Sequence, residues 1–151
     1  MLTITKEFSF HAAHRLRRPD CSDEENRQIY GHCAELHGHT YRLLVTLAGE
    51  PDGNGMILHF DELKSLVRRH VLDRYDHADL NALAEYQAIP PTAEHMARHL
   101  FAVLDAALSA DTSLCLHQVC VYETPTACAT YTRPLPAASC PASSTLSGAR
   151  L

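Results

Sequence analysis

The chain has 151 residues, of which 46% are hydrophobic and 21% charged, and its formal net charge is −5. This size favours one domain with a hydrophobic core of its own, and the acidic balance argues against nucleic acid as a direct partner. The two dense basic segments, Arg15–Arg18 and Arg68–His70, are short. Either could line a pocket for a phosphorylated small molecule, because a few arginines suffice for that.

The start of the chain has no basic segment followed by an apolar one, and no window approaches the roughly 18 apolar residues of a membrane span. We therefore expect a cytoplasmic protein with no membrane partner. The six cysteines lack the spacing of a disulfide framework, so we expect reduced thiols. They are Cys21, Cys33, Cys115, Cys120, Cys128 and Cys140.

Side-chain patterns predict two strands early in the chain. Residues 3–12 alternate loosely between apolar and polar side chains, and residues 39–48 are rich in β-branched and aromatic ones. The polar and charged stretch Asp20–Tyr30 predicts a loop between them. After residue 48 the sequence GEPDGNG indicates a turn, and we expect MILHF, residues 56–60, to return as the second strand of a hairpin.

Two helices and a strand pair complete the predicted fold. Asp61 is the expected N-cap of one helix, and Thr92, which follows two prolines, is the expected N-cap of another with an apolar stripe. Residues 113–125 and 127–135 predict a strand pair with a turn at Pro125. This order of elements favours an α+β fold with both helices on one face of an antiparallel sheet.

The composition changes after Arg133. Residues 134–151 are rich in proline, alanine and serine, a composition that buries too little apolar surface to fix its own structure. We expect one domain over residues 1–133 and a disordered tail beyond it.

The sequence GHCAELHGHTY, residues 31–41, concentrates histidines around one cysteine. On a strand, His37 and His39 point to the same side and form a pair of nitrogen ligands. The first strand offers a third ligand, His14 or His11, and their spacing of three residues favours only one of them. Three histidines with an open fourth position are typical of a catalytic zinc site, whereas Cys33 as fourth ligand would close it into a structural one. The spacing leaves both forms open.

Six separated motifs resemble, in order, those of one known family. They are FSFHAAHRL, CAELHGHTY, DELK, YDHADLN, PTAEHMA and VYET. From about Thr3 to Arg133 the chain resembles the 6-pyruvoyl-tetrahydropterin synthase family. The resemblance implies a T-fold, in which an antiparallel sheet carries two helices. It also implies homo-oligomers, trimers stacked into hexamers, with active sites between subunits.

The matching motifs imply a role for each candidate residue. His14, His37 and His39 match the zinc ligands, which leaves Cys33 off the metal as catalytic base. Zinc is a Lewis acid that can hold the hydroxyls of a polyol side chain and acidify the neighbouring protons. Asp76 and His77 match a second proton-transfer pair, in which the carboxylate orients the imidazole.

Three further residues match the part of the family site that holds the substrate. Glu123 matches a carboxylate that binds the guanidine-like edge of the pterin ring through two charge-assisted hydrogen bonds. Thr92 and Glu94 match the segment that frames the pterin, although a helix cap and a first-turn acid would look the same in sequence.

The interval Cys33-x-x-x-His37 resembles the branch of the family that acts in queuosine (7-deazaguanine) biosynthesis. That branch converts 7,8-dihydroneopterin triphosphate to 6-carboxy-5,6,7,8-tetrahydropterin, with release of acetaldehyde and triphosphate. The presence of Cys33 argues against a folate-linked branch that carries glutamate there. Two alternatives stay open: a synthase that forms the 6-pyruvoyl product, and a non-catalytic, zinc-stabilised oligomeric module that binds pterins.

Overall fold

A computed structural model describes residues 1–108 and 114–133. Its strands are β1 (Leu2–His14), β2 (His37–Gly49), β3 (Ala78–Asp79), β4 (Cys115–Thr124) and β5 (Ala127–Thr132). Its α-helices are α1 (Asp23–Tyr30), α2 (Phe60–Val67), α3 (Asp73–Tyr75) and α4 (Ala93–Leu108). A π-helical turn, η2 (Arg68–Leu72), joins α2 to α3, and the short 3₁₀ turns are η1 (Gly31–Ala34), η3 (Leu80–Ala82) and η4 (Ala84–Tyr86).

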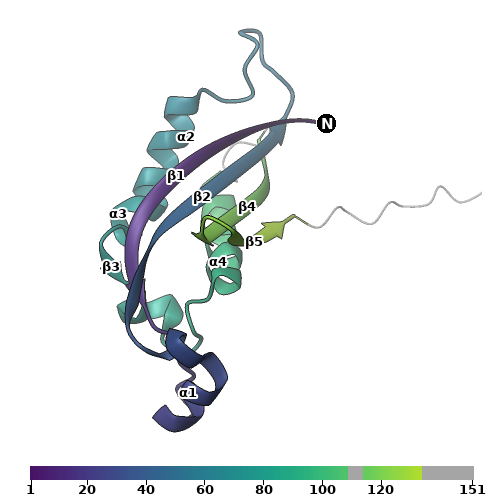
Figure 1. Ribbon diagram of the computed structural model, residues 1–151. Helices are drawn as coiled ribbons and strands as arrows, with labels where there is room; N and C mark the ends of the chain where they lie inside the picture. Colours follow the sequence, from purple (N-terminus) through teal and green to yellow (C-terminus); the bar gives the residue numbers. More distant parts are fainter. Residues whose placement is uncertain (109–113, 134–151) are drawn as a thin grey trace, which may run out of the picture.

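The strands form one sheet in the order β3-β1-β2-β4-β5. Neighbours among β1, β2, β4 and β5 are antiparallel, whereas the two-residue β3 pairs in parallel with β1. The predicted α+β class is confirmed, and β3 makes the sheet mixed rather than wholly antiparallel. Figure 1 shows β1 and β2 as a long, curved ribbon with α1 beyond one end of it.

The core lies between one face of the sheet and the helices. On β1 the alternate residues Phe8, Phe10, Ala12 and His14 are buried and those between them are more exposed. The helices contribute apolar residues to the same cluster, with Leu63 and Val67 from α2, and Met96, Leu100 and Leu104 from α4. Burial of this set supplies the hydrophobic free energy that holds the helices on the sheet.

The segment predicted as a loop over Asp20–Tyr30 contains a helix, α1. Ser22 caps it: the side chain of Ser22 accepts a hydrogen bond from the Glu25 amide, and the Glu25 carboxylate accepts one from the Ser22 amide. This capping box satisfies amides that the first turn leaves free. The prediction was wrong because α1 is polar on nearly every side, so it lacks the apolar periodicity that reveals a helix.

The predicted hairpin after residue 48 was also wrong. MILHF forms no strand, and β2 pairs instead with β1, along the whole length of β1 from Leu2 to His14, and with β4 on its other side. Helix α2 begins at Phe60 and is capped by His59, whose Nδ1 accepts from the Asp61 amide at 3.1 Å, so Asp61 is not its cap. The cap of α2 is thus an imidazole nitrogen and not the carboxylate that the sequence predicted.

The strand pair with its turn near Pro125 and the helix capped by Thr92 are confirmed. The predicted tail, residues 134–151, lies outside the described residues. Within residues 1–108 and 114–133, no helix is long and apolar enough to cross a membrane.

Candidate metal centre and active site

The pairing of β1 with β2 brings three histidines together. His14, the last residue of β1, lies opposite His37, the first residue of β2, and His39 lies two residues further along β2. Residues two apart on a strand share a face, so His37 and His39 point to the side on which His14 is buried. His11 lies on the opposite face of β1, where it is exposed. The structure therefore places His14, and not His11, with the pair.

A carboxylate from β4 completes this group. Val119 and Val121 are buried on the helix-facing side of β4, and Glu123 continues their alternation. One ligand atom from each of the histidines and one oxygen of Glu123 lie within 4.8 Å of one another. Three nitrogens and one oxygen are a donor set that suits zinc and other borderline divalent cations.

Backbone carbonyl groups orient two of the imidazoles. His14 Nδ1 lies 2.8 Å from Pro91 O, and His37 Nδ1 lies 2.7 Å from Glu35 O. A carbonyl oxygen only accepts, so each Nδ1 carries the proton, and a neutral ring then presents an unprotonated Nε2. The two Nε2 atoms lie 3.1 Å apart. Two lone pairs repel at this distance unless a cation or a proton lies between them.

The remaining potential ligand atoms also indicate a site for a cation. His39 Nε2 is buried without a hydrogen-bond partner, although Glu123 Oε1 lies 3.2 Å away, and burial lowers the pKa of His39. Glu123 Oε1 also lies 3.0 Å from His14 Nε2, and this contact with the His14 ring lowers the pKa of the Glu123 carboxyl. Tetrahedral zinc–nitrogen bonds would place two nitrogens about 3.3 Å apart. The residues therefore fit a four-coordinate metal ion.

Tyr41 lies on β2, two residues after His39, and its ring contacts two of the three histidines. It is fully buried, it stacks on Phe10 with ring centroids 5.1 Å apart, and its ring meets His14 and His39 edge-on. Its hydroxyl has no hydrogen-bond partner in the described part of the chain. Burial, with the nearby charge of Glu123, raises the pKa of Tyr41, so the hydroxyl stays protonated.

Cys33 lies outside this group of four side chains. It belongs to the turn η1, its side chain is exposed, and its carbonyl accepts a hydrogen bond from the Leu16 amide at 2.7 Å. That bond ties η1 to the chain just after His14. In the structure Glu123, and not Cys33, is the fourth potential ligand beside the histidines.

Asp76 and His77 also lie apart from the four potential ligands, beside His11. The His11 amide donates to Asp76 Oδ1 at 2.8 Å, and His77 Nδ1 lies 3.1 Å from Asp76 Oδ2. His77 has the positive φ of 61° that a non-glycine residue rarely adopts, and its amide donates to the His11 carbonyl. The His11 bond is the main reason that the pKa of Asp76 is lowered.

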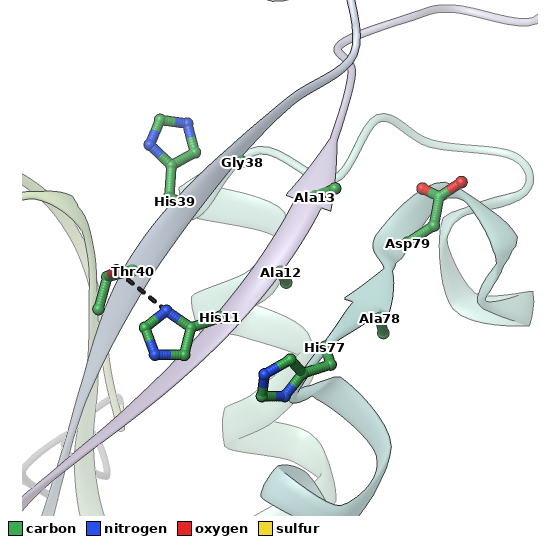
Figure 2. Close-up of a pocket in the computed structure, with 9 residues that line it drawn as sticks. All are labelled: His11, Ala12, Ala13, Gly38, His39, Thr40, His77, Ala78 and Asp79. Atoms are coloured by element: carbon green, nitrogen blue, oxygen red, sulfur yellow. Dashed lines mark hydrogen bonds between the residues drawn. The ribbon is translucent and has the colours of Figure 1, made fainter.

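Figure 2 shows the rings of His11 and His77 beside each other, with His39 turned away from them. The open pocket that these residues line has a volume of about 490 Å³. The His77 side chain is 77% exposed. An imidazole this exposed, paired with a carboxylate, is free to exchange protons with a group that enters from outside the chain.

Thr92 and Glu94 lie at the start of α4. Thr92 Oγ1 accepts from the His95 amide at 3.3 Å, which makes it a helix cap, and Glu94 is exposed. The neighbouring Pro91 carbonyl orients the His14 ring, so the backbone of this segment helps to position one potential metal ligand.

Sequence reasoning missed Glu123 as a neighbour of the histidines and missed the carbonyls of Glu35 and Pro91. The alternation Val119, Val121, Glu123 was a usable signal, because it predicts a carboxylate on the buried face of a strand. The carbonyl contacts leave no signal in the sequence, since every residue has a carbonyl group.

Comparisons with known proteins show the family of this chain. The family described as 6-pyruvoyl tetrahydropterin synthase matches residues 3–134. The 6-pyruvoyl tetrahydrobiopterin synthase of Drosophila melanogaster is 34% identical over 137 residues, which cover 88% of this chain and 80% of that protein. The 6-carboxy-5,6,7,8-tetrahydropterin synthase of Haemophilus influenzae is 33% identical over 153 residues, with 87% and 99% covered.

A solved structure supports the same assignment. The 6-pyruvoyl tetrahydropterin synthase of Caenorhabditis elegans superposes with a TM-score of 0.80 at 34% identity, covering 88% of this chain and 96% of that one. Sequence and structure thus agree over nearly the whole described chain, including the strands that carry the histidines. The chain belongs to the 6-pyruvoyl tetrahydropterin synthase family of pterin enzymes.

Proposed function

We propose that this chain is a zinc-dependent lyase of queuosine (7-deazaguanine) biosynthesis. It converts 7,8-dihydroneopterin triphosphate and water to 6-carboxy-5,6,7,8-tetrahydropterin, acetaldehyde and triphosphate. The observation that carries the proposal is the group of three histidines and Glu123, with Cys33 on a separate exposed turn. Relatives named for the carboxy-forming and the pyruvoyl-forming reactions are similarly close in sequence identity. We therefore base the proposed product on the short Cys33-to-His37 interval.

Each side chain has a proposed part in this reaction. Bound zinc supplies a Lewis acid for the side-chain hydroxyls of the substrate. Cys33 accepts a proton from that side chain as a base, and His77, held by Asp76, moves a proton on the other side. Glu123 accepts hydrogen bonds from the N–C–N edge of the pterin, which requires its carboxylate to turn from His14 and His39 toward the substrate.

The exposed position of His77 supports an active site shared between subunits. Apart from Ala12 and Ala13, the outer edge of β1 has no strand partner among the described residues, and β5 is the other edge of the sheet. Free edges favour pairing with another copy of the chain. We propose cytoplasmic trimers stacked into hexamers, in which Asp76 and His77 serve the metal centre of a neighbouring copy.

Product analysis tests the proposed reaction. Zinc-loaded protein is incubated with 7,8-dihydroneopterin triphosphate, and acetaldehyde is trapped with a hydrazine and quantified against the pterin product. We expect acetaldehyde and 6-carboxy-tetrahydropterin in equal amounts. A 6-pyruvoyl product without acetaldehyde would show that the chain catalyses the alternative reaction.

Replacing the thiol separates a catalytic centre from a structural zinc site. We expect Cys33→Ala to keep its zinc while turnover falls at least about a hundredfold, since general-base catalysis contributes that much. The control His37→Ala loses the metal. Metal content is measured by mass spectrometry after dialysis. Loss of zinc and of stability in Cys33→Ala would instead favour a non-catalytic module in which the cysteine closes the site.

A further inference from the structure

Three arginines line one cavity beside the Cys33 turn. Arg15 and Arg17 follow the end of β1, Arg27 belongs to α1, and all of them border a cavity of about 90 Å³. Guanidinium groups bind phosphate oxygens through pairs of parallel hydrogen bonds. We propose that this cavity, the arginine cavity, binds a phosphate group of the triphosphate chain; this inference rests on the substrate proposed above.

The backbone around the cavity is firmly held. The Arg15 amide donates to Asn81 Oδ1 at 2.8 Å, and Asn81 Nδ2 donates back to the Arg15 carbonyl at 3.0 Å. Asn26 of α1 is buried, accepts from the Arg18 amide at 2.8 Å and donates to the carbonyls of Arg18, Cys21 and Ser22. Helix α1 is thereby fixed against the segment that follows β1, so Arg27 faces the same cavity as Arg15 and Arg17.

The charges in the cavity leave one cation uncompensated. Arg17 Nη2 lies 3.3 Å from Asp23, and Arg27 Nε lies 3.1 Å from Glu35. Both pairs are largely exposed, so each contributes little stability and either arginine can exchange its carboxylate for a phosphate. Within residues 1–108 and 114–133, the Arg15 guanidinium forms no ion pair. Arg15 is therefore the residue on which anion binding depends most.

The position of the cavity suits the tail of a substrate held at the metal centre. Arg15 directly follows the potential ligand His14, and Glu35 connects the two sites, because its side chain pairs with Arg27 while its carbonyl orients His37. The cavity is small and polar, so it admits a phosphate group and not a pterin ring. The other basic segment lies elsewhere: Arg69 is on η2 and lines a separate cavity with residues of α2.

Calorimetry with sodium tripolyphosphate tests the site without depending on turnover. Zinc-loaded protein is titrated at low ionic strength, and zinc content is measured afterwards to detect metal lost to the probe. We expect Arg15→Gln to bind tripolyphosphate at least about tenfold more weakly than the unmodified chain, and Arg27→Gln to bind it more weakly as well. The matched control Arg69→Gln, another exposed arginine without an ion pair in the described residues, keeps full affinity.

Steady-state kinetics with 7,8-dihydroneopterin triphosphate separates this inference from the proposed function. We expect Arg15→Gln to raise KM about tenfold and to leave kcat within about twofold, because the lost contact binds substrate and transition state alike. Unchanged tripolyphosphate affinity in both Arg15→Gln and Arg27→Gln would overturn the arginine cavity, even if the unmodified chain forms product. Arginine-dependent tripolyphosphate binding by a chain that forms no product would overturn the proposed function and leave the anion site standing.

Discussion

At the scale of single residues, the group of His14, His37, His39 and Glu123 contains ring nitrogens that lack a suitable partner unless a cation is bound. His14 and His37 turn unprotonated nitrogens toward each other, and His39 Nε2 is buried with no hydrogen bond. Folded proteins rarely leave buried polar atoms without partners. The number of such atoms at one point is therefore stronger evidence for a bound metal than the residue types alone.

The Tyr41 hydroxyl provides a test of this reasoning. A buried hydroxyl without a partner costs desolvation free energy that no hydrogen bond returns. We expect Tyr41→Phe to raise the free energy of unfolding by about 1 kcal/mol in metal-free protein, measured by urea denaturation.

The control for that measurement is Tyr75→Phe. The Tyr75 hydroxyl donates to Glu85 at 2.9 Å, so its removal should lower the free energy of unfolding by about 1–2 kcal/mol. A loss of stability of similar size in Tyr41→Phe would mean that the Tyr41 hydroxyl has a hydrogen-bond partner in the folded protein.

At the scale of elements, α1 shows how a helix can depend on its cap. Its residues are nearly all exposed, and Asn26 is the one buried side chain among them. Little apolar burial holds α1 in place, so hydrogen bonds at its start and around Asn26 must do so. Helix α1 carries Arg27, and its stability therefore bears on the arginine cavity.

The capping box should make α1 sensitive to acid. Hydrogen bonds from the amide and the hydroxyl of Ser22 lower the pKa of Glu25 below its ordinary value of 4.5. The folded carboxyl thus binds protons less readily than the unfolded one, so its stabilisation is complete above about pH 4.5 and is lost as the pH falls through the lowered pKa. Amide hydrogen exchange, corrected for intrinsic rates, should show α1 protection falling over that range.

Two variants test whether Glu25 is responsible for the acid sensitivity of α1. Glu25→Ala should show reduced α1 protection at neutral pH and no further loss between pH 5 and 3, about the range in which carboxylates titrate. Glu24→Ala, which removes a first-turn acid whose carboxylate accepts a hydrogen bond from Gln28, should keep the acid dependence. Equal pH profiles in Glu25→Ala and the unmodified chain would assign the transition to other carboxylates.

At the scale of the whole molecule, the proposed catalytic residues are divided between two places. Cys33 belongs to the turn η1 before β2 and lies outside the group of His14, His37, His39 and Glu123, whereas Asp76 and His77 lie beside His11 on the opposite face of β1. One chain therefore does not assemble all of them around its own ligands. Symmetric association of identical chains can complete such a site, since each copy both gives and receives the missing residues.

Subunit complementation tests this division. Cys33→Ala and His77→Ala should each be inactive alone. When the two are mixed in equal amounts under conditions of subunit exchange, about a quarter of the sites should contain both native residues, and activity should return to about that fraction. Size-exclusion chromatography confirms exchange between differently tagged chains. Complete inactivity of the exchanged mixture would place the whole site within one chain.

The sequence alone was sufficient for the fold class, the strands β1, β2, β4 and β5, the helix α4 and the histidine pair. Alternation and helical periodicity are local properties, and His37 and His39 share a strand, so their common direction follows from the spacing. The choice of His14 over His11 needed the family motif in sequence and the strand register in the structure.

Only the tertiary structure decided how distant residues meet. Glu123 reaches the histidines because β4 pairs with β2, and two carbonyls fix the ring orientations because α4 and η1 pack where they do. The helix α1 and the cavity that it lines depend on hydrogen bonds of one buried asparagine and a capping box. These contacts join residues that no sequence periodicity relates. They stabilise the protein only once the chain has folded and brought those residues together.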